Sequence, residues 1–325
     1  MPQLPAPLHV ELAPVFRVGT ALALGHSPGR MRAADLDAPF RGMRRRRTPP
    51  VTVDLTEPLA RDRIQREHVL DQARAYFAVA PDHTFLAGRS AAVVWGLPCV
   101  HGERLEAAVL SPHRAPRRPG IRGRKLAPHL TSVRVSGGIR LTSPAATFAM
   151  LGGELSHRDL VALGDAIVRI PRDHRGRPIP DQQLASLEQL VGATNAPGRK
   201  NRARLAAALA DVRVGSMSVL ETDYRLLAAA AGLPEPVLDV EIRHPSGALI
   251  GIVDAAYPEF HTIAEVEGDH HRTSRMQWER DIEKHAALTA LGWEVIRVTA
   301  AHIRGAHPRA AESVASALRR HGWTG

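Results

Sequence analysis

The chain has 325 residues, 44% of them hydrophobic, and a formal net charge of +10. This length is too great for one small core and predicts two or three domains, and no apolar run is long enough to cross a bilayer, so we expect a soluble protein. The positive charge favours a polyanionic partner, whereas an aromatic content of 4% argues against a single-strand-binding surface of stacked rings.

Cysteine usage and the N-terminal sequence predict a cytoplasmic protein. Cys99 is the single cysteine, which excludes an internal disulfide and fits a reducing compartment. The opening sequence MPQLPAPLHV lacks the basic region and apolar core of a secretory signal. The high content of alanine, arginine and proline indicates a GC-rich genome, which adds arginine for reasons unrelated to function and weakens the charge argument.

Residues 1–50 are predicted to form a winged helix-turn-helix. Apolar residues recur at helical spacing from Val18 to Leu24, and the glycine that follows ends that helix. The dipeptide Ser27-Pro28 then begins a second helix as N-cap and first helical residue. The next stretch, FRGMRRRR, would form a strand or wing. A small helical hairpin with a solvated basic tail is the alternative, because a bare helix-turn-helix pattern has low specificity.

If this unit binds DNA, its second helix enters a major groove and its arginines hold backbone phosphates. The candidate DNA-binding residues are Arg30, Arg32, Arg41, Arg44, Arg45, Arg46 and Arg47. A run of like charge is commonly a solvated face. The contribution of the last four arginines therefore depends on the helices before them.

Residues 51–170 are predicted to form an α+β domain. An amphipathic helix over 61–79 is followed by a short helix at GRSAAVVWGLP and by β-runs at LEAAVLS, IRGRKL, SVRVS and GIRLT. Two helices, SPAATFAMLGG and SHRDLVALGDAIVR, then close the domain. Its histidines are scattered in loops without metal-ligand spacing, so we expect no catalytic site here.

The remaining chain is predicted to contain a linker with a basic helix, residues 171–215, and a compact α/β domain, residues 216–325. The linker assignment rests on IPRDHRGRPIPDQQ, which is rich in proline, glycine and charge and lacks periodicity. In the last domain the predicted order is a helix, three strands, a helix, a strand and a helix. The middle strands form a hairpin with acidic residues inside apolar patterns.

The register of that hairpin places two acids opposite each other. If residues 258–261 form the turn, Asp254 faces Glu265, with Cβ atoms about 4.5 to 5.5 Å apart, a relation in which like charges are destabilising. The two-residue period of a strand puts Glu267 on the same face as Glu265. A divalent cation offsets such repulsion, because Mg²⁺ binds one or two carboxylates together with water and phosphate oxygens.

Residues 216–304 contain, in order, a helix glutamate, IVDAAYPE, EVEG, a histidine pair, a glutamine and LGWEVIRVT. This series of motifs resembles the PD-(D/E)xK nuclease superfamily, in particular domains related to very-short-patch repair endonucleases. The resemblance implies a restriction-endonuclease-like fold, a mixed sheet flanked by helices, and DNA hydrolysis with Mg²⁺ or Mn²⁺. It assigns the metal to Asp254 and Glu265. The other catalytic positions are Glu221, Glu267, His271 and Gln277.

One departure from the family pattern concerns the lysine expected two residues after Glu265. Glu267 occupies that position, so the usual water-activating cation is missing. Residues 1–170 resemble, through PFRGMR, GRSAAVVWGLP and RLTSPAATF, the winged-helix antitoxins of type IV abortive-infection systems. That resemblance implies promoter DNA binding through an α+β winged-helix region and no nucleotide cofactor.

Several of these site residues also have structural explanations. Ser218-x-x-Glu221 and Ser274-x-x-Gln277 both fit the capping box of a helix start, and adjacent histidines are commonly solvated. The sequence therefore predicts a DNA-binding protein with a metal-dependent endonuclease domain. The alternative is a non-catalytic DNA-binding regulator of antitoxin type whose nuclease-like domain is degenerate. Neither function requires a membrane or a small-molecule cofactor.

Overall fold

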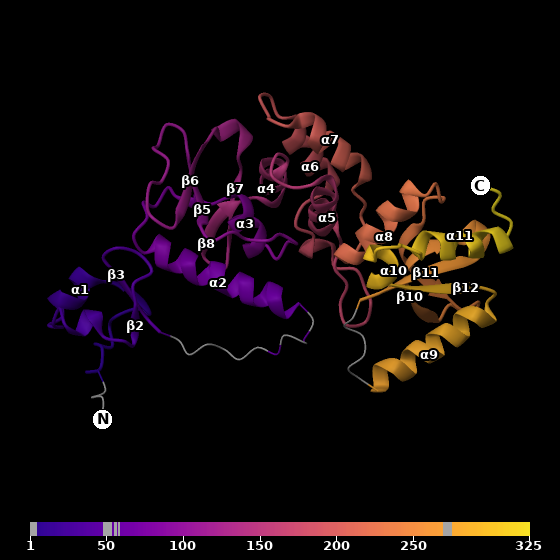
Figure 1. The fold of residues 1–325 in the computed structure, drawn as a ribbon, viewed down its shortest axis with the longest axis horizontal. Coiled ribbons are helices and arrows are strands. Elements are labelled where there is room, and N and C mark those ends of the chain that lie inside the picture. Colours follow the sequence, from indigo (N-terminus) through magenta and orange to yellow (C-terminus); the bar gives the residue numbers. More distant parts are fainter. Residues whose placement is uncertain (1–4, 48–53, 55–56, 58, 269–274) are drawn as a thin grey trace. The chain divides into compact units, whose positions relative to one another are not determined.

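The protein is a mixed α/β protein whose sheets are flanked by helices (Figure 1). A computed structural model of the chain describes residues 5–47, 54, 57, 59–268 and 275–325. Within the described residues, two of the three sheets combine parallel and antiparallel strands. The chain divides into two compact units, Met1–Thr147 and Phe148–Gly325.

The first unit begins with a small antiparallel sheet of order β1-β3-β2. Its elements are β1 (Val15–Arg17), α1 (Val18–Ala23), η1 (Arg30–Arg32), β2 (Leu36–Asp37) and β3 (Met43–Arg46). The helix packs on this sheet through a small cluster formed by Leu12, Phe16, Ala21, Met31 and Leu36. Strand β3 confirms the strand expected within FRGMRRRR.

The second helix expected from Ser27-Pro28 is wrong, because only the 3-10 turn η1 forms there. The Ser27 side chain does accept a hydrogen bond from the backbone N–H of Arg30, at 3.1 Å. The chain must then reach β2, where Leu36 pairs with Arg46 and is itself buried. Because η1 ends at Arg32 and β2 begins at Leu36, the chain between them is too short for a second full helix.

A five-stranded mixed sheet of order β6-β5-β4-β8-β7 forms the rest of the first unit. The elements are α2 (Ala60–Phe77), β4 (Phe85–Leu86), α3 (Gly88–Val94), β5 (Leu105–Leu110), β6 (Ile121–Leu126), η2 (Pro128–Leu130), β7 (Val133–Ser136) and β8 (Ile139–Thr142). The amphipathic helix and the four β-runs expected here are confirmed. Helix α4 (Pro144–Leu151) contains the boundary with the second unit.

The second unit begins with a helical layer. Its elements are α5 (His157–Val168), η3 (Pro180–Gln182), α6 (Leu187–Asn195) and α7 (Arg202–Asp211). Helix α6 was not expected within 171–215, although Ser186 and Gln189 form a complete capping box at its start. The basic helix expected after residue 200 is confirmed as α7.

A four-stranded mixed sheet of order β12-β11-β10-β9 follows, with β11 and β12 parallel and the other neighbours antiparallel. The elements are α8 (Val219–Ala230), β9 (Val237–Arg243), β10 (Leu249–Tyr257), η4 (Pro258–Phe260), β11 (Thr262–Glu267), α9 (Arg275–Ala290), β12 (Glu294–Thr299), α10 (Ala300–Arg304) and α11 (Ala310–Arg320). The expected order of helices and strands is confirmed, and only α10 was not foreseen.

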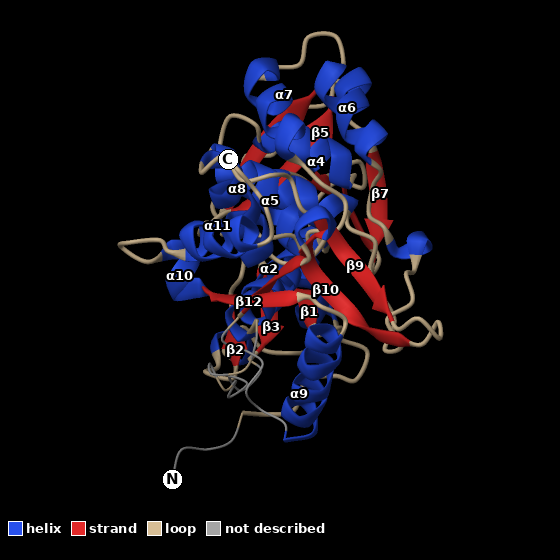
Figure 2. Ribbon diagram, turned by 90° about the vertical axis from the view of Figure 1, so that its right-hand side faces the viewer, coloured by secondary structure: helices blue, strands red, loops and turns tan. Residues whose placement is uncertain are grey.

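Helices cover both faces of this sheet. Helices α8 and α11 pack on the face that carries Ala255 and Ala264, whereas α9 packs through Leu288 on the face that carries Ile263. Figures 1 and 2 show the strands between these layers. Glu265 follows Ala264 on β11 and faces the side of α9, where Lys284 contacts it.

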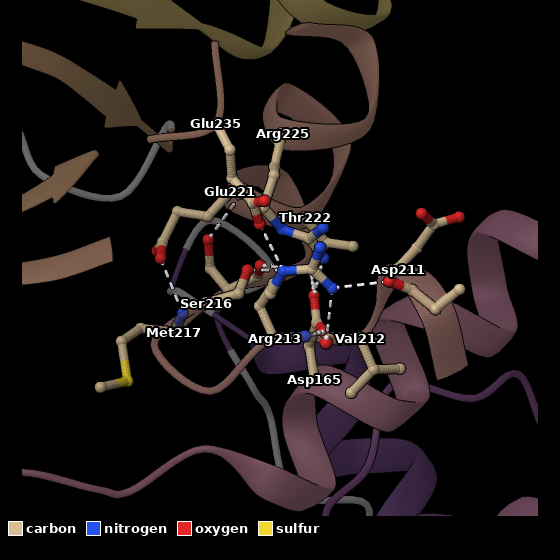
Figure 3. Close-up of polar contacts among 12 residues, drawn as sticks. Asp165, Asp211, Val212, Arg213, Ser216, Met217, Glu221, Thr222, Arg225 and Glu235 are labelled. Carbon is tan, nitrogen blue, oxygen red and sulfur yellow. Dashed lines mark hydrogen bonds and ion pairs between the residues drawn. The ribbon is translucent and has the colours of Figure 1, made fainter. Parts of the chain in front are cut away.

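A buried ion pair joins the helical layer to α8 (Figure 3). Asp165 Oδ2 accepts hydrogen bonds from Arg225 Nη2 and Thr222 Oγ1, both at 2.8 Å, and its Oδ1 accepts one from the backbone N–H of Arg213 at 2.8 Å. The side chains of Asp165 and Arg225 are 2% and 6% exposed. Removing one partner leaves the other as an uncompensated buried charge.

We therefore expect Asp165→Ala to destabilise the second unit by about 3–5 kcal/mol, because Arg225 stays buried without its counter-ion. Urea unfolding followed by circular dichroism measures the loss. The double variant Asp165→Leu with Arg225→Met is the control, and it should recover most of the stability because neither charge remains. A loss below about 1 kcal/mol in the single variant would show that the pair is not a structural requirement.

Candidate functional site

The hairpin of β10 and β11 has the register expected from the sequence. Ala255 pairs with Ala264 and Tyr257 with Thr262, and the connecting residues form η4 and a left-handed residue, His261, with φ of 42°. The pairing ends at Ala255 and Ala264, and Asp254 and Glu265 are the next residues of the two strands. Continuing the register by one residue sets them opposite each other, and the charge of Glu265 acts on Asp254.

The row of charges extends to both neighbouring strands. On one side, Leu238 pairs with Ala255 and Val240 with Val253, so the intervening Asp239 of β9 lies level with Asp254. On the other side, Arg297 of β12 pairs with Glu265. Three carboxylates and one guanidinium group therefore occupy one level of the sheet, where the sequence predicted only the central pair.

Asp254 is a partly buried acid that is expensive to ionise. Its Oδ2 accepts a hydrogen bond from the backbone N–H of Val266 at 2.7 Å. Burial raises the pKa of Asp254 to about 8, and the charges of Glu221 and Glu265 add to the increase. A proton or a cation at this carboxyl group is thus strongly favoured.

Glu221 lies at the start of α8, close to the other acids. Its backbone N–H donates to Ser218 Oγ at 3.2 Å, and its own Oε2 accepts a hydrogen bond from the backbone N–H of Met217 at 2.7 Å. It therefore helps to cap α8. Burial raises the pKa of Glu221 to about 7, with smaller contributions from the charges of Asp239 and Glu265. The capping residue is consequently also part of the acidic site.

Lys284 of α9 is a site residue that the sequence interpretation missed. Its Nζ lies 2.7 Å from Glu265 Oε1 and donates a hydrogen bond to the carbonyl oxygen of Ile252 at 2.6 Å. The aliphatic part of the side chain fits against Gly251, where an added Cβ would lie 2.8 Å from Lys284 Cε. The site therefore holds an ammonium group beside its second carboxylate.

Two signals in the sequence point to Lys284. It is the one lysine of residues 216–325, a range in which arginine is otherwise used. It also follows position 277 by seven residues, which is two turns along the same side of a helix. The family pattern places the lysine on the same strand as Glu265, whereas here the ammonium group comes from helix α9.

The other residues assigned by the family resemblance have different outcomes. Glu267 forms an ion pair with Arg297 of the neighbouring strand, and its side chain is 28% exposed. His271 lies outside the described residues. Gln277 lies in α9, but its side chain is outside the described part of the structure. The described core of the site is therefore Glu221, Asp254, Glu265 and Lys284.

The candidate DNA-binding arginines of the first unit differ in their exposure and in the contacts that they make within the unit. Arg30 is buried, binds Asp35 through two hydrogen bonds of 2.8 and 2.6 Å, and also donates to Ala6 O. Arg44, Arg45 and Arg47 likewise make contacts within the unit, with Met31 O, Asp37 and Asp71. The exposed side chains are Arg32, Arg41, Arg46 and Arg47. Arg30, expected on a groove-binding helix, instead joins the 3-10 turn to the following loop.

The acidic pair suits a hard divalent cation. Among the described residues, no group of three or more His, Cys, Asp or Glu side chains is arranged to hold a metal ion. Mg²⁺ does not require such a group, since it commonly keeps several waters and uses one or two carboxylates. Asp254 and Glu265 supply two carboxylates. A cation would offset the burial that raises the pKa of Asp254 and the smaller effects of the Glu221 and Glu265 charges. The donor set fits magnesium.

Comparison with known proteins gives two relatives and no family. No family profile and no solved structure matches the chain. The uncharacterized proteins Rv2248 and MT2308 of Mycobacterium tuberculosis are each 30% identical to it over 189 residues, which is 58% of this chain and 64% of each relative. The chain thus spans slightly less than two thirds of those relatives. None of the described helices has the length and apolar character needed to cross a membrane.

Proposed function

We propose that the protein is a DNA-binding, metal-dependent endonuclease, and that residues 216–304 form a domain of the PD-(D/E)xK nuclease type. The observation that carries the proposal is the pair of acids Asp254 and Glu265 in the β10–β11 hairpin, with the partly buried Glu221 and the ammonium group of Lys284 beside it. Two acids, a third carboxyl group and a cation at one site are the parts required for phosphodiester hydrolysis.

The arrangement of elements supports this assignment. Helix α8, strands β9 to β11, helix α9 and strand β12 follow the order helix, three strands, helix, strand that the resemblance implies. The acids lie on the two central strands of the sheet, and Lys284 provides from α9 the cation that Glu267 does not supply. The departure at position 267 therefore does not leave the site without an ammonium group.

Asp254 and Glu265 would hold a magnesium or manganese ion, which when bound polarises the phosphate and lowers the pKa of a bound water. Lys284 holds the Glu265 carboxylate in place through its 2.7 Å contact and brings a positive charge next to a phosphate entering the site. Glu221, whose pKa is raised to about 7, can hold or release a proton near neutral pH, as a general acid or base must.

Cleavage of supercoiled plasmid DNA tests the proposed function. Purified protein with Mg²⁺ or Mn²⁺ should convert the plasmid to the nicked or linear form, and a chelator should prevent this. The antitoxin-like regulator predicts a different result, in which DNA is retarded in a gel but stays uncut with either metal. That second result in wild-type protein would overturn the endonuclease proposal.

The first unit would contribute DNA binding through its exposed arginines. Replacing Arg41 and Arg46 with alanine should weaken duplex binding and lower the slope of log K against log salt by about 1 to 2, because up to two phosphate contacts are lost. Fluorescence anisotropy over a salt series measures both quantities. Replacing the exposed Arg61 and Arg74 of α2 removes the same charge elsewhere in that unit and should change the slope less. If the two double variants have equal salt slopes, Arg41 and Arg46 do not contact DNA.

A further inference from the structure

The segment between α5 and η3 is a closed basic hairpin, residues 171–178. Arg172 and Pro178 form a β-bridge, and the backbone N–H of Asp173 donates to Arg177 O at 2.8 Å. Asp173 Oδ1 accepts hydrogen bonds from the backbone N–H groups of Arg175 and Arg177 at 2.8 and 2.9 Å. Its tip therefore has a defined conformation, although the sequence predicted a linker here.

Arg172 fixes this basic hairpin to strand β9. Its Nε lies 3.0 and 2.9 Å from the two carboxylate oxygens of Asp239, and its Nη1 lies 3.0 Å from Glu241 Oε1. The same Nη1 donates to the carbonyl oxygen of Gly176 at 2.6 Å. One guanidinium group thus joins the tip of the hairpin to two acids of the sheet.

The hairpin packs against β10 at Gly176, which lies close to the side chain of Ile252. Gly176 has a φ of 77°, and a Cβ built there would lie 2.8 Å from Ile252 Cδ1. Asp239, which binds Arg172, lies level with Asp254, and its charge contributes to the raised pKa of Glu221. The basic hairpin therefore borders the acidic site.

The charges of the hairpin tip are available to a ligand. Arg172 is neutralised by Asp239 and Glu241, and the Asp173 carboxylate is held by backbone donors, which lower its pKa. The remaining basic residues, His174, Arg175 and Arg177, are exposed. Within the described residues, the guanidinium groups of Arg175 and Arg177 make no ion pair. Arg175 and Arg177 are therefore available to bind a ligand next to the acidic site.

We propose that the basic hairpin binds the phosphate backbone of duplex DNA next to the acidic site, through Arg175 and Arg177. The inference rests on the proposed function, since it assigns the second unit, which contains both the hairpin and the acidic site, the same substrate. Guanidinium groups bind phosphate oxygens in paired hydrogen bonds and carry no sequence information when they do so. The rigid attachment through Arg172 and Gly176 fixes the distance between the bound backbone and Asp254. The hairpin consequently positions the strand that is cut.

Duplex binding of the variant Arg175→Ala with Arg177→Ala tests the proposal. In the presence of a chelator, so that no DNA is cut, affinity for a short labelled duplex should fall about tenfold at low salt, and the salt slope should fall by about 2. The control replaces Arg309, which precedes α11, and Arg319 within α11, both of which are exposed. This control has the same net charge and should keep the wild-type slope.

A charge-neutral variant separates hairpin position from hairpin charge. Gly176→Val forces the hairpin away from Ile252 without altering any charge, so DNA should still bind but the cleavage rate at saturating DNA should fall about tenfold. Unchanged affinity and salt slope in Arg175→Ala with Arg177→Ala would overturn the hairpin proposal even if the wild type cuts plasmid. Conversely, reduced binding in that variant together with a wild type that never cuts would leave the hairpin as a DNA contact and reject the nuclease.

Discussion

Asp254→Asn is expected to lower DNA cleavage by about 10³-fold or more, because loss of a metal-binding carboxylate removes several kcal/mol of transition-state stabilisation. Single-turnover nicking of labelled plasmid measures the rate. Glu259→Gln is the matched control, since Glu259 is an exposed acid in the turn of the same hairpin, and it should cleave like the wild type. Cleavage by Asp254→Asn at the wild-type rate would place the chemistry elsewhere.

The same substitution should stabilise the protein in a defined pH range. Burial raises the pKa of Asp254 from 3.8 to about 8, so between these values the folded protein holds a proton that the unfolded chain releases. Stability therefore falls as pH rises from about 4 to 8, and the full cost is present above 8. Asparagine has no proton to lose. At pH 8.5 we expect Asp254→Asn to melt roughly 5 °C or more above the wild type.

Magnesium gives an independent check on that interpretation. In the wild type, Mg²⁺ should replace the proton at Asp254 and raise the melting temperature most at high pH, because binding to the folded state alone stabilises it. The variant lacks one ligand and should show a smaller increase. If Mg²⁺ shifts both proteins equally, the ion binds elsewhere.

Lys284→Met is expected to lower cleavage by about 10²- to 10³-fold, the usual cost of removing one charged or hydrogen-bonding group from the site of reaction. DNA affinity and Mn²⁺ binding should be retained, because the carboxylates remain and Glu265 loses only its competing ammonium partner. Single-turnover cleavage, anisotropy and calorimetry measure the three quantities. An unchanged cleavage rate would remove Lys284 from the catalytic group.

Gly251→Val provides a second way to test the position of Lys284. The added side chain would occupy the space of the Lys284 methylene groups and displace the ammonium group without removing it. Cleavage should fall as in Lys284→Met, while the midpoint of unfolding measures any general damage. Full activity in Gly251→Val would show that the ammonium group need not lie where the structure places it.

The parts of the site that were predictable from sequence are those fixed by local rules. A turn at 258–261 is sufficient to set the hairpin register, so the pairing of Ala255 with Ala264, next to Asp254 and Glu265, followed from the turn alone. The capping interaction at Ser218 was likewise local. Each of these depends on residues close in sequence.

Contacts between distant elements account for what was missed. Lys284 reaches Glu265 from a helix, Arg172 reaches Asp239 from a segment that resembled a linker, and neither pairing is encoded in spacing. Arg30 was assigned to DNA binding for a related reason. The helix expected there is only a 3-10 turn, and Arg30 forms an ion pair with Asp35 in the loop that follows. Within a stretch of consecutive arginines, the sequence alone does not show which side chains are exposed and which are buried, because that depends on contacts with residues elsewhere in the chain.

Glu221 contributes both to the start of α8 and to the charge of the acidic site, so its presence in a homologue has two explanations. Its carboxylate accepts the backbone N–H of Met217 at the start of α8 as well as adding to the charge of the site. A lineage that lost cleavage would still be under selection to keep this acid, because replacing it would weaken the helix start. Retention of glutamate here therefore does not distinguish an active homologue from an inactive one. The informative position is Lys284, whose polar contacts with Glu265 and Ile252 both lie within the site.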